Sequence, residues 1–281
     1  RRTSFRVGGP ADLFAEPKSV EVLTALIAAA RQHQIPVTLI GSGTNLLVSD
    51  LGIRGMVITT RRLKTGIRVL SETGSQALVR AGAGERLAAV CRFAADNGLS
   101  GLEFSAGIPG TVGGAVIMNA GTPKGCMGNI IDQVTLLNRQ TLEIHSVGKE
   151  EINFKYRDSG LNGIVLASVL CLDKAESPVI RQAMDNNIEN KKNTQPISAA
   201  SAGCFFKNPA EGKPAGQLIE EAGMKGKRIN DAQVSTVHAN YIVNLANASC
   251  KDILELQQQV QKTVMDKFNI KLEVEVRVEG E

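Results

Sequence analysis

The feature that most constrains this chain is a glycine-rich segment, Gly107-Ile-Pro-Gly-Thr-Val-Gly-Gly-Ala115. Regular helices and strands disfavour such a composition, because each glycine inside one costs roughly 0.5–1 kcal/mol. The whole chain holds 28 glycines among 281 residues, above the usual share of about 7%. Since they cluster, they favour tight turns and close approach of the backbone to a flat or phosphorylated ligand. A close-packed turn between two elements is the alternative.

A second glycine-rich loop, Gly41-Ser-Gly-Thr-Asn45, directly follows an apolar strand expected at 37–40. Successive backbone N–H groups in such a loop can bind a phosphate. The loop is not a Walker A motif, because no Gly-Lys-Ser/Thr follows, and it lacks the third glycine of the dinucleotide fingerprint. An ordinary tight turn remains the alternative to phosphate contact.

Apolar periodicity predicts a mixed α and β chain. Helices are expected at 20–31, with Ser19 as N-cap, and at 86–97, 180–192, 215–222 and 251–268. Strands are expected at 11–16, 37–40, 55–58, 77–81, 134–137, 142–146, 164–170, 241–245 and 272–279. The last strand alternates, which puts Glu275 and Arg277 on one face. Gln195-Pro196 predicts a domain boundary, and the length fits two domains or three small ones.

Composition narrows the function classes. The net charge of +4 with only 4% aromatic residues and no Trp argues against a single-strand nucleic-acid binder and fits an anionic ligand. Five irregularly spaced cysteines without a C-x-x-C motif disfavour a disulfide scaffold and predict reduced thiols in a cytosol. No signal-peptide pattern opens the chain and no apolar run reaches 18 residues, so a cytoplasmic location is expected.

The histidines predict no metal site. His33, His145 and His238 share no ligand spacing, and we interpret them as structural or surface residues. His238 differs from the other two because it precedes Ala-Asn240 before an expected strand.

Three further segments carry reactive side chains. In Tyr156-Arg-Asp-Ser159, Arg157 could bind a carboxylate or phosphate bidentately, although a surface salt bridge is the plainer alternative. Cys204 lies in Ala202-Gly-Cys-Phe-Phe-Lys-Asn-Pro209 and is either a small core residue or a proton donor or nucleophile. Lys207 and Asn208 beside it suit an anionic substrate. Glu275 and Arg277 could equally form a surface cross-strand pair.

Together these segments resemble one family, the UDP-N-acetylenolpyruvoylglucosamine reductases of peptidoglycan precursor synthesis. The resemblance runs through nearly the whole chain, with the matching segments in the order of the family. They are 3–11, 41–47, 101–115 with 118–121, 156–159, 203–209, 215–219 and 275–277.

The resemblance implies an α+β fold with a two-part FAD-binding region, like that of the vanillyl-alcohol-oxidase flavoproteins, and a C-terminal α+β substrate-binding domain. It places the first FAD-binding subdomain at 1–60, the second at 61–194 and the substrate-binding domain at 195–270, with the terminal strand 271–281 able to return to the second part. The chain resembles the shorter type of the family, which lacks an extra loop carrying a substrate-binding Tyr, because Tyr156 and Tyr241 are its only tyrosines. Members are often monomeric, so a monomer is expected.

The implied reaction has two halves. NADPH reduces bound FAD, and the flavin then delivers hydride to C3 of the enolpyruvyl group of UDP-N-acetylglucosamine enolpyruvate, after which C2 is protonated to give UDP-N-acetylmuramate. By position, Arg157 would clamp the carboxylate, Glu275 would orient or polarise the enol ether, and Cys204 would donate the proton. Many members have Ser at that last position, and a thiol is a far stronger acid than a Ser hydroxyl.

The resemblance also implies the binding residues. The expected FAD contacts are Gly41, Ser42, Gly43, Thr44, Asn45 and Leu46 at the pyrophosphate, Gly107, Ile108, Gly110, Thr111, Gly113, Gly114 and Ala115 along the flavin, and Arg277 near a phosphate. The expected substrate contacts are Tyr156, Lys207, Asn208, Gln217 and Asn240, with Lys191 or Lys192 as further candidates for the diphosphate.

Two other functions compete with a reductase. A flavin or nucleotide-sugar binding protein would turn over nothing, and a flavin oxidase would reduce oxygen with another donor. Substrate-dependent consumption of NADPH discriminates among the three.

Overall fold

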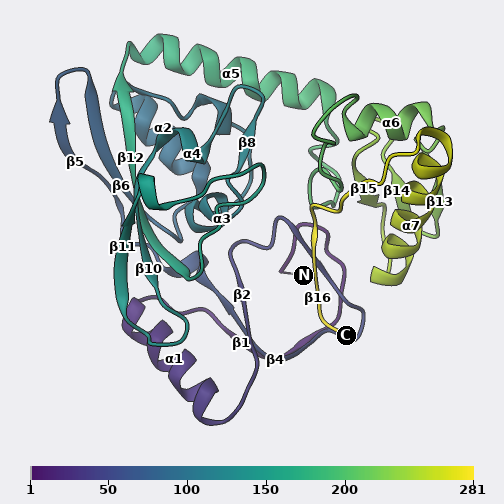
Figure 1. Cartoon of the computed structure of the whole chain (residues 1–281), viewed down its shortest axis with the longest axis horizontal. Coiled ribbons are helices and arrows are strands. Elements are labelled where there is room, and N and C mark those ends of the chain that lie inside the picture. The colour runs from purple at the N-terminus through teal and green to yellow at the C-terminus, as the bar shows by residue number, and fades with distance from the viewer. Residues whose placement is uncertain (1) are drawn as a thin grey trace. The chain divides into compact units, whose positions relative to one another are not determined.

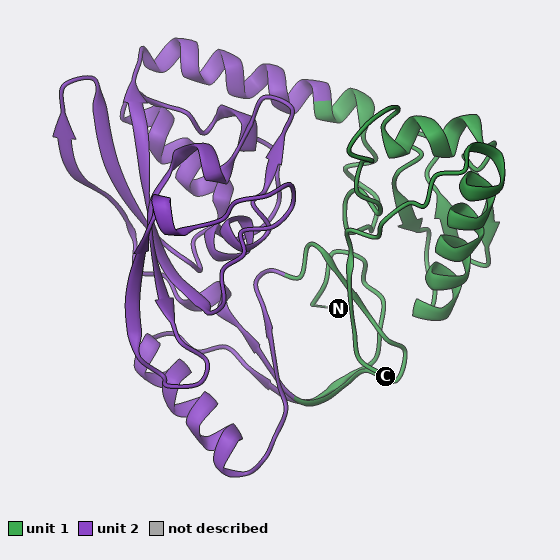
Figure 2. Cartoon of the chain, in the orientation of Figure 1, with its two compact units in different colours: residues 1–12, 43–55, 191–281 green, residues 13–42, 56–190 purple. Residues whose placement is uncertain are grey.

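The computed structural model describes residues 2–281 and divides into two compact units (Figure 2). Unit 1 comprises residues 1–12, 43–55 and 191–281, and unit 2 comprises residues 13–42 and 56–190. Unit 1 therefore combines segments from both ends of the chain with a short internal piece. The three-part division expected from the sequence stays a prediction.

Unit 2 is built on an antiparallel sheet in the order β11-β10-β12-β6-β5 (Figure 1). Its strands are β5 (Ile67–Thr73), β6 (Gln76–Gly82), β10 (Ile131–Leu137), β11 (Ile144–Gly148) and β12 (Ile164–Lys174), with β7 (Leu99–Ser100) paired to β12. The central strand β12 is buried from Ile164 to Leu170, as expected for the apolar run that forms this part of it.

Short helices cover this sheet and form its core. They are α2 (Leu87–Asp96), α3 (Val112–Ile117) and α4 (Met127–Ile130), with the 3-10 turns η2 (Glu103–Ser105) and η3 (Lys149–Glu151) and the hairpin of β8 (Gly121–Thr122) and β9 (Gly125–Cys126). Leu87 and Val90 of α2 and Val112 and Val116 of α3 are fully buried in one cluster with Val134 of β10. Burial of side chains of this size contributes roughly 1.5–3 kcal/mol each.

A smaller sheet has the order β1-β4-β2. It contains β1 (Ala11–Ala15), β2 (Val37–Ile40) and β4 (Ile53–Thr59), followed by the 3-10 turn η1 (Thr60–Arg62). Helix α1 (Val20–Gln32) begins at Ser19, whose side chain accepts a hydrogen bond from the Val22 amide as predicted. It buries Leu23 and Ile27 in a cluster with Ile58.

The C-terminal part of unit 1 packs two helices with a three-stranded antiparallel sheet. The sheet order is β13 (Arg228–Ile229), β14 (Ala232–Val234) and β15 (Ile242–Asn244), and the helices are α6 (Ala215–Glu221) and α7 (Cys250–Phe268). Helix α7 buries Ile253, Leu256, Val260 and Val264 along one stripe, which matches its predicted amphipathic pattern. Helix α5 (Ser177–Thr194) contributes residues to both units.

The last predicted strand is wrong over most of its length. Only Arg277–Glu279 forms a strand, β16, which pairs in parallel with β3 (Leu46–Val48). Upstream, the Glu275 amide donates to the Phe205 carbonyl at 2.9 Å and the Glu273 carbonyl accepts from the Lys207 amide at 2.8 Å. Because the chain changes partner between these contacts and β16, Glu275 and Arg277 do not share one regular strand.

The predicted strand 142–146 is displaced to β11 (Ile144–Gly148). Leu142 has φ +62°, a left-handed conformation that a strand excludes. Among residues 2–281, no helix combines the length and the apolar composition that a membrane span requires.

Candidate active site

The glycine segment 107–115 forms a tight turn and the start of α3 in unit 2. Gly107 has φ +78° and Gly110 has φ +139°, conformations that favour glycine over residues with a side chain. Thr111 then caps α3 by accepting from the Gly114 amide at 3.4 Å. A Cβ at Gly113 would lie 3.0 Å from the Ala83 Cβ, so the segment lies pressed against the end of β6.

The structure brings Gly41 to this same segment. A Cβ at Gly41 would lie 2.8 Å from the Thr111 Oγ1, which leaves no room for a larger residue. The Thr59 hydroxyl donates to the Gly41 carbonyl at 2.7 Å. The first residue of the loop 41–45 thus meets the segment 107–115 within unit 2, and the family resemblance assigns both segments to one ligand.

The rest of the first loop lies in unit 1 and turns its carbonyl groups towards protein. The Gly43 carbonyl accepts from the Ser4 amide at 3.0 Å, and the Asn45 carbonyl accepts from the Arg277 amide at 3.2 Å. The Thr44 carbonyl accepts from the Ser4 hydroxyl at 3.3 Å. These contacts place Arg277 beside the loop, with its own side chain paired to Glu279. A loop whose acceptors face protein is suited to present donors to an anion.

Arg157 occupies a tight turn of unit 2 together with Tyr156. The Lys155 amide donates to the Asp158 carbonyl at 2.8 Å, and the Asp158 amide donates back to the Lys155 carbonyl at 3.2 Å. Arg157 itself has φ +60°. Its Nη1 donates to the Gly121 carbonyl at 2.9 Å, and its guanidinium lies 5.1 Å from the centre of the Tyr156 ring. Tyr156 is 52% exposed, whereas Arg157 is half-buried.

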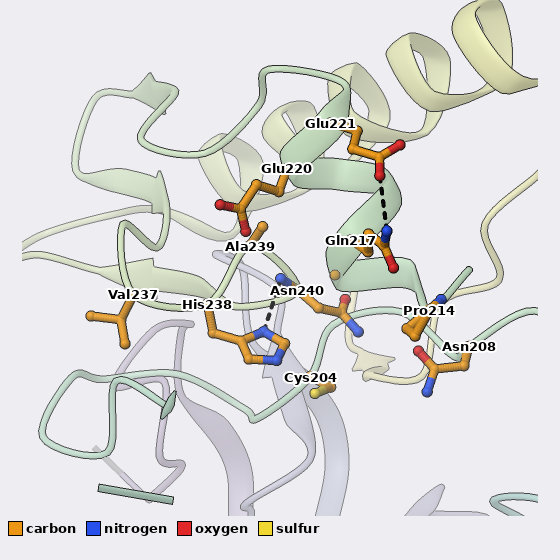
Figure 3. A pocket seen from close by; sticks show the side chains of 11 residues that line it. Cys204, Asn208, Pro214, Gln217, Glu220, Glu221, Val237, His238, Ala239 and Asn240 are labelled. Carbon is orange, nitrogen blue, oxygen red and sulfur yellow. Dashed lines mark hydrogen bonds between the residues drawn. The ribbon is translucent and has the colours of Figure 1, made fainter. Parts of the chain in front are cut away.

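Cys204 lines a cavity of about 610 Å³ within unit 1 (Figure 3). The other lining residues are Asn208, Pro214, Gly216, Gln217, Glu220, Glu221, Val237, His238, Ala239 and Asn240. The residue after Cys204, Phe205, accepts through its carbonyl from the Glu275 amide at 2.9 Å. The fold therefore brings the backbone of Glu275 next to the Cys204 segment, whereas Arg157 belongs to unit 2.

Three of the predicted substrate contacts line this cavity with Cys204. The Asn208 Oδ1 accepts from the Ala215 amide at the start of α6, at 3.0 Å. The Gln217 Nε2 donates to Glu221 at 2.9 Å, a bond drawn in Figure 3. Lys207 is not among the lining residues, and its ammonium pairs with Glu273.

The third of these residues, Asn240, also holds the Cys204 segment in place. Its Oδ1 accepts from the Phe206 amide at 2.9 Å and its Nδ2 donates to the Phe206 carbonyl at 2.8 Å. With its carbonyl, which accepts from the Phe205 amide at 2.7 Å, Asn240 fixes both residues that follow Cys204. This structural function was not predicted.

His238 is a cavity residue that the sequence analysis set aside. Its Nδ1 accepts from the Asn240 amide at 3.2 Å, and its ring meets the Tyr241 ring edge-on with centroids 5.1 Å apart. Burial lowers the pKa of His238 from its ordinary value of 6.5, Lys225 acts in the same direction, and Glu220 opposes both. The only sequence signal was its position two residues before Asn240.

The lowered pKa of His238 predicts an acid-sensitive contribution to stability. Unfolded His238 gains its proton near its ordinary pKa of 6.5, while the folded residue resists protonation to lower pH. As pH falls through that value, the unfolded state binds more protons and stability decreases. His238→Gln is therefore expected to lose less stability than the unsubstituted protein between about pH 7.5 and about pH 5.5. Urea unfolding at both pH values measures this, and equal losses would contradict it.

No group of three or more His, Cys, Asp or Glu side chains within residues 2–281 is arranged to hold a metal ion. None of the five cysteines there forms a disulfide.

Comparison with known proteins identifies the two parts of the chain. Residues 11–142 match the FAD binding domain model, and residues 195–279 match the model of the UDP-N-acetylenolpyruvoylglucosamine reductase C-terminal domain. The predicted α+β fold with an FAD-binding region and a C-terminal domain is therefore confirmed.

Relatives that match over nearly their whole length indicate the same family. The chain is 42% identical to UDP-N-acetylenolpyruvoylglucosamine reductase of Desulfosudis oleivorans, over 100% of this chain and 92% of the relative. It is 43% identical to that of Moorella thermoacetica, over 100% and 91%. The crystal structure of the reductase from Thermus caldophilus is similar with a TM-score of 0.82 and 38% identity, over 99% of this chain and 96% of that one. The chain belongs to the UDP-N-acetylenolpyruvoylglucosamine reductase family.

Proposed function

We propose that this chain catalyses the NADPH-dependent reduction of UDP-N-acetylglucosamine enolpyruvate to UDP-N-acetylmuramate, a step of peptidoglycan precursor synthesis. The observation that carries the proposal is the position of Cys204, which lines a cavity of about 610 Å³ together with amide side chains suited to a polar ligand. Full-length similarity to reductases of this name supports it. The absence of disulfides among the five cysteines fits the reducing cytoplasm proposed as its location.

The residues present fit FAD by the chemistry of their donors. In the loop 41–46, the carbonyls of Gly41, Gly43, Thr44 and Asn45 are all bonded to protein, which suits the backbone amides to a pyrophosphate. The segment 107–115 would lie along the flavin, where glycine permits close approach, and Arg277 beside the loop would face a phosphate. When bound, FAD supplies a hydride acceptor for NADPH and a hydride donor for the enolpyruvyl group.

Arg157 is proposed to bind the substrate carboxylate. Delivery of hydride to C3 moves electron density onto C2 and the carboxylate, which gives an enolate-like species. A guanidinium fixed in advance stabilises that charge more in the transition state than in the ground state. The Gly121 carbonyl and the Tyr156 ring hold the guanidinium in place, so little rearrangement is needed at the moment of reaction.

Cys204 is proposed to protonate C2 and Glu275 to orient or polarise the enol ether. Two contacts support these roles. The Glu275 backbone bonds to Phe205, and Asn240 fixes Phe205 and Phe206. A proton donor must lie within hydrogen-bond reach of the atom it protonates, so a rigid Cys204 segment serves the reaction.

The remaining predicted contacts are proposed to bind the UDP-sugar. Asn208 and Gln217 lie on the cavity wall with Cys204, and their amide groups can bind diphosphate or sugar oxygens. The family resemblance also implies substrate contacts for Lys207 and Tyr156. The ammonium of Lys207 pairs with Glu273 in this structure.

Gly41→Ala is expected to lower FAD binding. The new Cβ would lie 2.8 Å from the Thr111 Oγ1. Either the Thr111 side chain rotates and gives up the bond from the Gly114 amide, or the two segments separate, at a cost of about 1–3 kcal/mol. The molar ratio of bound FAD to purified protein measures the effect. Gly148→Ala is the matched control, because its Cβ would meet nothing closer than the Glu151 Oε1 at 3.7 Å. Full FAD occupancy in Gly41→Ala would contradict the expectation.

Steady-state turnover tests the function. Consumption of NADPH should depend on UDP-N-acetylglucosamine enolpyruvate, and the product should be heavier than that substrate by the mass of two hydrogen atoms. No turnover at all would favour a binding protein, and oxygen consumption with another donor would favour an oxidase.

A further inference from the structure

The turn that carries Arg157 holds an unfavourable backbone conformation. Arg157 has φ +60°, and a non-glycine residue in the left-handed region is unfavourable unless its surroundings enforce it. The two backbone hydrogen bonds between Lys155 and Asp158 close the turn but do not attach it to the rest of unit 2.

The attachment comes from residues 117–121, which begin with the last residue of α3. The Ser159 amide donates to the Ile117 carbonyl at 3.1 Å. The Asn119 Nδ2 donates to the Lys155 carbonyl at 2.9 Å, and the Gly121 carbonyl accepts from the Arg157 Nη1 at 2.9 Å. Hydrogen bonds to one short segment therefore hold the turn at its start, at its end and at the guanidinium.

Of these three contacts, only the one from Asn119 uses a side chain of the segment 117–121. The other two use its backbone carbonyls. Asn119 is 6% exposed and has φ +40°, a conformation that asparagine tolerates better than most residues. Its Oδ1 accepts from the Gly128 amide at 2.9 Å, so the amide bridges α4 to the Lys155 carbonyl. Both the Oδ1 and the Nδ2 of this buried side chain therefore form the link between α4 and the Lys155 carbonyl.

We propose that Asn119 is a positioning residue that holds the Arg157 turn in register with the Gly121 carbonyl and so fixes the guanidinium for the substrate carboxylate. The inference rests on the proposed function for the role of Arg157. Displacement of a catalytic group by about 1 Å can cost on the order of 100-fold in rate, so loosening this link acts on the step that Arg157 serves. Reduction of the flavin by NADPH does not use Arg157 and should be unaffected.

Two substitutions of Asn119 test whether it positions the Arg157 turn or only stabilises the fold. Asn119→Gly keeps the left-handed backbone accessible but removes both bonds. Asn119→Asp keeps an acceptor for the Gly128 amide but loses the donor to the Lys155 carbonyl. Asn129→Ala is the control, because Asn129 is exposed. Its Oδ1 accepts from the amide and the thiol of Cys126 at the start of α4.

Anaerobic stopped-flow measurements on the FAD-loaded full chain give the first readout. Both Asn119 variants should be reoxidised by UDP-N-acetylglucosamine enolpyruvate about 10–100-fold more slowly, with flavin reduction by NADPH within about twofold of the unsubstituted protein. Asn129→Ala should match the unsubstituted protein in both half-reactions. In an Arg157→Ala background, Asn119→Gly should change reoxidation less than about twofold, because coupled residues are not additive.

Hydrogen exchange at the Lys155 and Asp158 amides gives a second readout that needs no substrate, and exchange should be faster in both Asn119 variants. Unchanged exchange with an unchanged reoxidation rate, or a full additional loss in the Arg157→Ala background, would overturn the inference. If Asn119→Gly does not fold, Asn119→Asp decides by the same criteria. If the unsubstituted protein is not reoxidised by the substrate, the proposed function fails, while the exchange measurement still decides whether Asn119 holds the turn.

Discussion

Cys204→Ala is expected to slow the reoxidation of the reduced enzyme by UDP-N-acetylglucosamine enolpyruvate by about 10²–10⁴-fold, the contribution typical of a positioned general acid. The loss should fall on protonation of C2, because alanine offers no proton at the cavity wall. Reduction of the flavin by NADPH should stay near its original rate. The measurement is anaerobic stopped-flow absorbance of each half-reaction separately.

Two variants sharpen the Cys204 prediction. Cys204→Ser keeps a hydroxyl donor at the same position and should retain much more activity than Cys204→Ala. Cys171→Ala removes a partly buried thiol from β12 in the other unit and should leave both half-reactions unchanged. Equal rates of reoxidation for the unsubstituted protein and Cys204→Ala would exclude Cys204 as the proton donor.

Arg157→Ala is expected to slow the same half-reaction by about 10²–10³-fold, the usual cost of losing one group that stabilises a developing negative charge. Substrate affinity should also weaken, because the carboxylate is charged before and after hydride transfer. Arg157→Lys keeps the charge but not the planar fork of donors, so its rate should lie between the two.

The control for Arg157 is an arginine on the surface of unit 2. Arg181 pairs with Asp96 on the surface, and Arg181→Ala should change neither half-reaction. Stopped-flow reoxidation across a range of substrate concentrations separates rate from affinity. A rate for Arg157→Ala within about threefold of the original would remove Arg157 from the catalytic step.

Local patterns in the sequence predict the elements that are decided locally. The amphipathic stripe of α7 and the Ser19 cap of α1 depend on residues within one or two turns, and both are present in the structure. Strand β5 was missed because its alternation is short: Ile67 and Val69 alternate with Arg68, but the strand then continues through exposed residues that show no contrast between two faces.

Features decided by distant partners were not predictable from the sequence. The segment 272–279 alternates like one strand, yet Phe205 and Lys207 bind its first part and β3 binds its last. Asn119 and Lys155 are 36 residues apart, and no periodicity links them. His238 enters the cavity because the fold places its ring against the distant Gly216, where a Cβ would lie 3.0 Å from the His238 Cε1.

The most direct test of the central claim joins both half-reactions in one anaerobic experiment. The FAD-loaded protein is reduced with one equivalent of NADPH, and UDP-N-acetylglucosamine enolpyruvate is then added while flavin absorbance is followed. We predict rapid return of the oxidised flavin spectrum without oxygen, with UDP-N-acetylmuramate formed in equal amount. A flavin that NADPH bleaches but that stays reduced after the substrate is added would contradict the claim.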